Sequence, residues 1–130
     1  MKKLLAVGLI AAFALLSACS TGTDSGNGYQ VIDAKKAKQM MDQSQSYVIV
    51  DVRTQAEYAT GHIANAVLIP VDQVAQLAPD QLTDKQQLIF VYCRTGARAA
   101  QGSAMLVQLG YTNVYDIGGI VNWPYGTVTS

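Results

Sequence analysis

The sequence predicts an α/β domain built on a mainly parallel sheet flanked by helices, and two observations lead to this fold class. Two runs, Tyr47–Val52 and Leu88–Tyr92, are almost continuously apolar, as expected of strands that are buried on both faces of a sheet. Segments with helical periodicity alternate with the strand segments, which is typical of parallel sheets covered by helices. The functional site of such a domain is expected beyond the carboxyl ends of its strands.

Helices are predicted where apolar residues recur at helical spacing between capping signals. Asp33 is a suitable N-cap for a helix over 33–43. Thr54 and Glu57 have the spacing of a capping box for a short helix that ends near Gly61. The remaining expected elements are helices over 71–77 and 99–109, strands over 67–69 and 113–117, and a short apolar stretch over 29–32.

The N-terminus is predicted to be a secretory leader that is not part of the fold. Lys2 and Lys3 precede an uncharged apolar run over 4–16, which is too short for a comfortable membrane span. The run ends in Leu16-Ser17-Ala18-Cys19, which resembles the lipobox of bacterial lipoproteins. This resemblance implies cleavage before Cys19 and a diacylglyceryl group on its sulfur. The alternative is an ordinary secretory signal with a small-residue cleavage site.

Three segments follow: a signal peptide over 1–18, the lipidated cysteine with a flexible tether over 19–28, and a domain over 29–130. The tether has almost nothing to bury, so a flexible chain is expected there. Ser20 is not the aspartate associated with retention in the inner membrane. For a Gram-negative host, we therefore expect a lipid-anchored protein of the cell envelope, on the outer membrane and facing the periplasm.

The charge and the cysteine content limit which partners and which covalent links the mature chain can have. Removal of the leader with its two lysines would leave seven basic and nine acidic residues, a formal charge of −2. No basic surface is expected, so nucleic acid is not a predicted partner. If Cys19 carries lipid, Cys93 is the single thiol of the mature chain, and an internal disulfide is excluded.

The segment Cys93-Arg94-Thr95-Gly96-Ala97-Arg98 is the candidate site, because it lies between a buried strand and a helix start. Free backbone N–H groups converge there and favour negative charge, which stabilises a thiolate, the nucleophilic form of cysteine. Gly96 allows the backbone to turn so that successive N–H groups point at one anion. The alternative for Cys93 is a small buried hydrophobe at a strand end.

This loop is one of several motifs that resemble the single-domain rhodanese family. The motifs occur in the family's order over nearly all of residues 29–126. Besides the loop, they are Asp51-Val52-Arg53, Glu57-Tyr58, Gly61-His62-Ile63-Ala64-Asn65-Ala66, Ile69-Pro70, and Gly118-Gly119-Ile120 with Trp123. The resemblance implies a five-stranded parallel sheet with helices on both faces, and no metal ion or organic cofactor.

The resemblance also implies an activity and roles for residues. Cys93 would take sulfane sulfur from thiosulfate or a similar anionic donor, carry it as a persulfide, and pass it to a thiol or cyanide-like acceptor. The amides of Arg94, Thr95, Gly96, Ala97 and Arg98 would hold the anion, and the two arginine side chains would attract it. Asp51 and Arg53 would support the site, with Asp51 capping a turn or pairing with an arginine of the cysteine loop.

Two alternative functions stay open. A non-catalytic rhodanese-like binding module would use the loop to hold an anion or a partner segment. An oxyanion phosphatase or arsenate reductase would resemble a seven-residue loop from the cysteine to the arginine, whereas Cys93 to Arg98 is six residues. His62 is expected to brace loops and Trp123 to pack at the rim. The departures from the family pattern are Asn65 in place of glycine, Ala99 in place of serine, and a brief segment after Gly126 that would leave an edge more open.

Overall fold

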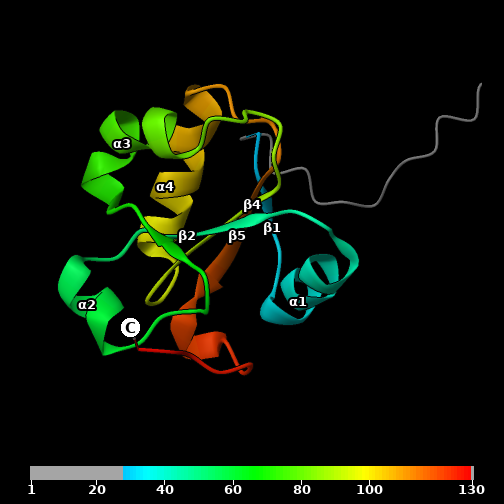
Figure 1. The fold of residues 1–130 in the computed structure, drawn as a ribbon, viewed down its shortest axis with the longest axis vertical. Coiled ribbons are helices and arrows are strands. Elements are labelled where there is room, and N and C mark those ends of the chain that lie inside the picture. The colour runs from blue at the N-terminus through cyan, green and yellow to red at the C-terminus, as the bar shows by residue number, and fades with distance from the viewer. Residues whose placement is uncertain (1–27, 130) are drawn as a thin grey trace, which may run out of the picture.

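The computed structural model describes residues 28–129, in which helices and strands alternate along the chain (Figure 1). The predicted signal peptide, Cys19 and the tether up to residue 27 lie outside the described residues. Within the described part, no helix combines the length and apolarity needed to cross a bilayer. The elements are β1 (Gln30–Val31), α1 (Ala34–Gln43), β2 (Val48–Asp51), α2 (Gln55–Thr60), β3 (Val67–Leu68), η1 (Val71–Gln73), α3 (Val74–Gln81), β4 (Ile89–Cys93), α4 (Ala97–Gln108), β5 (Val114–Gly119) and η2 (Ile120–Asn122).

In residues 28–129, five strands form one sheet in the order β1-β5-β4-β2-β3, and each neighbouring pair is parallel. The predicted α/β fold class with a parallel sheet is therefore confirmed. β4 lies at the centre, and every residue of this strand is buried. Burial on both faces explains why its sequence is continuously apolar rather than alternating.

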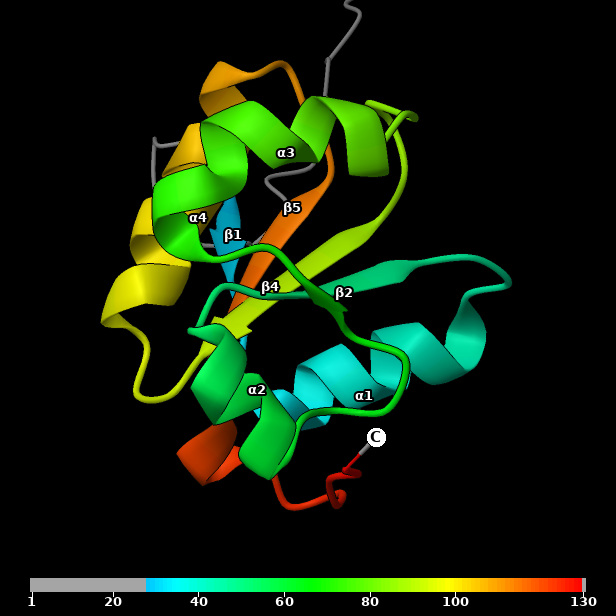
Figure 2. The same ribbon diagram turned by 60° about the vertical axis from the view of Figure 1, so that its left-hand side comes forward.

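Helices cover both faces of the sheet (Figure 2). α3 and α4 pack on one face, where the core includes Val50, Val91 and Leu106. α1 and α2 lie on the other face, where Ile49 and Phe90 belong to the second core. Alternate residues of β2 and β4 thus enter opposite cores, as the two-residue period of a strand requires.

Two predicted helix starts, those of α1 and α2, are confirmed by their caps. The side chain of Asp33 accepts a hydrogen bond from the backbone N–H of Lys36 at 2.8 Å, which fixes the start of α1. At α2, the Thr54 side chain accepts from the N–H of Glu57, and the Glu57 carboxylate accepts from the N–H of Thr54. Gly61 follows α2 with a φ of 152°, so the predicted stop is also confirmed.

Two predicted helices have different limits in the structure. α4 begins at Ala97 rather than at residue 99, because Gly96 adopts a φ of 121° and its carbonyl accepts the N–H of Ala100. α3 continues past Pro79 to Gln81, although proline usually ends a helix. Its buried face packs on the core through Val74 and Ala78, so tertiary contacts outweigh the local signal.

The segments around the predicted departures are well fixed. Asn65 adopts a φ of 66°, the left-handed conformation that asparagine tolerates better than other residues with a side chain. The brief C-terminal segment returns to the domain, where Val128 pairs antiparallel with His62. The N–H of each of these two residues donates to the carbonyl oxygen of the other, at 2.9 and 2.8 Å. Residues 124–129 are nevertheless all exposed, and the expectation of a more open edge stays a prediction.

Candidate functional site

The candidate site lies at the carboxyl edge of the sheet, around the last residue of β4. Cys93 ends β4 and is level with Gly119 at the end of β5. Asp51 ends the neighbouring strand β2 and pairs in register with Tyr92. This edge is where parallel α/β sheets place their ligands, because the loops that follow the strands meet there.

The sulfur of Cys93 lies inside the turn that connects β4 to α4. The residue is only 1% exposed, and its Sγ accepts a hydrogen bond from the backbone N–H of Gly96 at 3.0 Å. No side chain caps the start of α4, so the amides of its first turn have no side-chain acceptor. Thr95 and Ala97 are exposed on either side of Gly96. The turn therefore supplies the Gly96 N–H to the sulfur, at a helix start whose backbone groups favour an anion.

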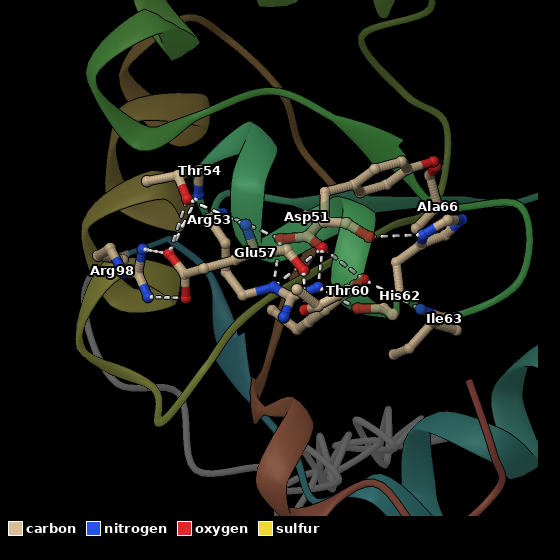
Figure 3. A network of polar contacts seen from close by, with 12 residues as sticks. Asp51, Arg53, Thr54, Glu57, Thr60, His62, Ile63, Ala66 and Arg98 are labelled. Carbon is tan, nitrogen blue, oxygen red and sulfur yellow. Dashed lines mark hydrogen bonds and ion pairs between the residues drawn. The ribbon is translucent and has the colours of Figure 1, made fainter. Parts of the chain in front are cut away.

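Arg98 is held by an ion pair with Glu57 of α2 (Figure 3). Its Nη1 and Nη2 atoms donate to the two carboxylate oxygens of Glu57 at 2.6 and 2.9 Å. This bidentate contact lowers the pKa of Glu57 to about 2, with a smaller contribution from hydrogen bonds donated by Thr54. The ion pair joins α4 to α2. Because the carboxylate neutralises the guanidinium, Arg98 adds little net charge to the site.

Arg94 has a different environment. Its side chain is exposed, and none of the ion pairs within residues 28–129 involves it. It borders a hollow of about 450 Å³ beside the cysteine turn. The other residues that line this hollow are Arg53, Ala56, Glu57, Thr60, Ile120 and Val121. Arg94 therefore supplies a positive charge outside these ion pairs at the mouth of the hollow.

Asp51 and Arg53 form a buried ion pair (Figure 3), and Arg53 also lines the hollow. Asp51 is fully buried and Arg53 is 5% exposed, and Nη2 of Arg53 lies 2.7 Å from Oδ2 of Asp51. The same guanidinium donates to the carbonyl oxygen of Gly61. Tyr92 donates its hydroxyl to Asp51 at 2.7 Å, and burial together with this bond raises the pKa of Tyr92. The pair thus ties β2 to β4 and to the end of α2.

This geometry corrects one expectation and agrees with another. Asp51 pairs with Arg53 of its own loop and not with an arginine of the cysteine loop, because the chain after β2 turns Arg53 back over the strand end. Oδ1 of Asp51 also accepts the backbone N–H of Arg53 at 2.9 Å, which is the predicted capping role. Arg53 satisfies the buried carboxylate, and its support of the functional site stays a prediction.

His62 and Trp123 occupy structural positions. The imidazole of His62 is 3% exposed and stacks on the ring of Tyr58, with centroids 3.7 Å apart. Its Nδ1 lies 3.0 Å from the carbonyl oxygen of Tyr58, which can only accept, so Nδ1 carries the proton. The indole of Trp123 meets the ring of Tyr125 edge-on at 5.0 Å. These contacts agree with bracing by His62 and rim packing by Trp123.

Sequence reasoning missed two residues of the site. The sequence assigns Glu57 to a capping box and to a family motif, but it does not predict the ion pair with Arg98. Its occurrence in the Glu57-Tyr58 motif was a signal that it does more than cap a helix. Tyr92 was expected only as an apolar strand residue, and nothing in its pattern indicates that its hydroxyl satisfies Asp51, because that contact joins residues 41 apart in the chain.

Comparison with known proteins identifies relatives of this domain. Residues 33–124 match the rhodanese-like domain family. A protein named sulfurtransferase from Allochromatium vinosum is 36% identical over 95 residues, which cover 71% of this chain and 85% of that protein. A tRNA uridine(34) hydroxylase from Yersinia pestis is 34% identical over 105 residues, which cover 77% of this chain but only 29% of the hydroxylase.

Solved structures share the fold. A structure described as a rhodanese with anions from E. coli superposes with a TM-score of 0.62 and 28% sequence identity. The match covers 65% of this chain and all of the E. coli chain.

Proposed function

Because this chain belongs to the rhodanese-like domain family, we propose that it is a sulfurtransferase that carries sulfur as a persulfide on Cys93. The observation that carries the proposal is the Cys93 sulfur, which accepts the Gly96 N–H within an uncapped helix start. Persulfide chemistry needs such a cradle, because the sulfur carries negative charge both before and after it takes the sulfane atom.

The proposed reaction has two displacement steps. In the first, the Cys93 thiolate attacks the outer sulfur of thiosulfate or a similar donor. The donor's sulfur–sulfur bond breaks, sulfite leaves with the bonding electron pair, and Cys93 becomes a persulfide anion. In the second, an acceptor thiolate or cyanide attacks the outer sulfur of the persulfide, and the electron pair returns to Cys93 as thiolate. The acceptor leaves as a persulfide or as thiocyanate.

Anionic donors are favoured by the charges around the turn. Glu57 neutralises Arg98 and Asp51 neutralises Arg53, so Arg94 is the arginine available to a donor in this hollow. The hollow next to Arg94 provides room for a donor or acceptor beside the turn. Its wall includes Ile120 and the strongly exposed Val121, so the part of a substrate away from the anionic group meets apolar surface.

We also propose that the chain works in the cell envelope, anchored by lipid on Cys19. The described chain enters the domain at Gly28, where a Cβ atom would meet the side chain of Val107 near the end of α4. Cys93 lies beside the opposite end of the same helix. The first described residue and the cysteine turn therefore lie near opposite ends of α4, an arrangement that supports the proposal.

One mass measurement tests the activity and the anchor together. Full-length protein is purified from membranes, incubated with thiosulfate and measured intact, while released sulfite is assayed in parallel. We expect a mature chain that begins at residue 19, carries a diacylglyceryl group, and gains one sulfur atom on Cys93 with matching sulfite. A chain without lipid would refute the anchor. A Cys93 that gains no sulfur from thiosulfate or an organic persulfide would favour the binding module.

The Arg94→Ala variant is expected to bind thiosulfate more weakly. Loss of one charge-assisted contact should raise KM by about tenfold and change kcat much less, because the sulfur cradle is built from backbone groups. Steady-state sulfite release gives both constants. Lys36→Ala is the matched control, since it removes an equal charge from an exposed position of α1 outside the hollow. An equal KM in both variants would contradict the role of Arg94.

A further inference from the structure

The pairing of β4 with β5 contains an irregularity immediately before the cysteine turn. Val91 pairs with Asp116 and Cys93 pairs with Gly119, so β5 uses three steps where β4 uses two. The extra residue lies in the Ile117–Gly118 segment, and Gly118 adopts a φ of 83°. Such a bulge leaves one residue outside the ladder and redirects the strand that follows it.

Asp116 satisfies the backbone of this bulge. Its side chain is 5% exposed, and its Oδ1 accepts the N–H of Gly118 at 2.8 Å. Within residues 28–129 no cation pairs with the carboxylate. Burial raises the pKa of Asp116, and the hydrogen bond from Gly118 opposes that shift. Burying a carboxylate without a charge partner costs free energy of folding, so a compensating role at the bulge is expected for Asp116.

The bulge supports the cysteine turn directly. A Cβ atom on Gly119 would lie 2.2 Å from the carbonyl oxygen of Arg94 and 2.7 Å from the Cα of Thr95. The N–H of Val121 donates to that carbonyl oxygen at 3.3 Å. The backbone of Arg94 and Thr95 therefore rests on the segment that begins with the bulge, in a contact that only glycine permits.

We propose that Asp116 is a positioning residue, whose carboxylate fixes the Gly118–Gly119 bulge and so fixes the turn that holds the Cys93 sulfur. The Asp116 side chain acts by accepting the N–H of Gly118 and not by contact with substrate. The inference deepens the proposed function, because the geometry that it fixes is the cradle for the thiolate and persulfide. It concerns backbone order, which can be measured without any sulfur donor.

The test compares Asp116→Ala with Asp116→Asn. Asparagine keeps an oxygen that can accept the Gly118 N–H, whereas alanine removes it. For the alanine variant, we expect amide hydrogen exchange at Gly96 and Gly118 to rise by about tenfold, the effect of losing one hydrogen bond. We expect kcat for sulfite release to fall by a similar factor with a smaller change in KM. The asparagine variant should stay within about twofold of wild type in each measurement.

Asp84→Ala is the matched control. Asp84 accepts the N–H of Gln86 at 2.9 Å, the same contact with the residue two positions ahead, in the exposed loop before β4. This variant should leave exchange at Gly96 and the kinetics unchanged. Equal losses in the alanine and asparagine variants of Asp116, or none in either, would overturn the proposal.

Two further measurements separate the possible failures. If the alanine variant does not fold, amide exchange at Gly118 in the wild type tests the proposal. Exchange there as fast as in an unbonded loop amide would overturn it. If Cys93 of the wild type gains no sulfur from thiosulfate or from an organic persulfide, the proposed function fails, while the exchange comparison still tests Asp116.

Discussion

Replacing Cys93 with serine is expected to abolish sulfur loading and to reduce sulfite release to the uncatalysed rate. Serine is close to cysteine in size, and its oxygen can still accept the N–H of Gly96, so the turn should keep its form. The hydroxyl, however, is not ionised near neutral pH and cannot form a persulfide. Intact-mass measurement after thiosulfate treatment should show no added sulfur.

Cys19→Ser provides the matched control for this result. The chain has two cysteines, and Cys93 is the one within the described residues. If Cys93 is the sulfur carrier, the Cys19 variant should lose the lipid but load sulfur at the wild-type rate. Sulfur loading that persists in Cys93→Ser and disappears in Cys19→Ser would show that Cys19 carries the sulfur, and it would refute the proposed function.

Replacing Asp51 with asparagine is expected to lower the free energy of unfolding by about 3–5 kcal/mol. The guanidinium of Arg53 is 5% exposed and would remain buried without a carboxylate. The hydroxyl of Tyr92 would also lose its charged acceptor. Equilibrium urea denaturation at neutral pH measures the loss, with the slope of the transition as a check that the unfolded state is unchanged.

Asp42→Asn is the comparison for Asp51. Asp42 pairs with Lys38 on the exposed surface of α1, where water and side-chain freedom reduce the value of an ion pair. Its loss should be within the error of the urea experiment. If Asp51→Asn costs as little as Asp42→Asn, the buried pair does not stabilise the site, and Arg53 must find another acceptor in the variant.

A double replacement of the buried pair separates charge from packing. Asp51→Leu with Arg53→Met removes both charges and keeps apolar volume, so it should be less destabilising than Asp51→Asn alone. In the double variant the Tyr92 hydroxyl has no acceptor at position 51, which limits how much of the free energy of unfolding is recovered.

The sequence alone predicted two helix starts, the strand before Cys93 and the turn after it. Asp33, Thr54 and Glu57 predicted the starts of α1 and α2, because capping depends on contacts between residues three positions apart. The apolar run before Cys93 predicted a buried strand, and Gly96 predicted a tight turn after it. Each of these features is fixed by neighbours in the chain, so it can be read without knowing the fold.

The tertiary structure decided which charges are available at the site. Arg94 and Arg98 looked equivalent in the sequence, but only Arg98 reaches Glu57, 41 residues earlier in the chain. Asp51 accepts hydrogen bonds from Arg53 and Tyr92. Asp116 accepts the N–H of Gly118, in a bulge that no sequence pattern predicts. Charge pairing depends on distances of a few ångströms between distant segments, and these distances exist only after the sheet has formed.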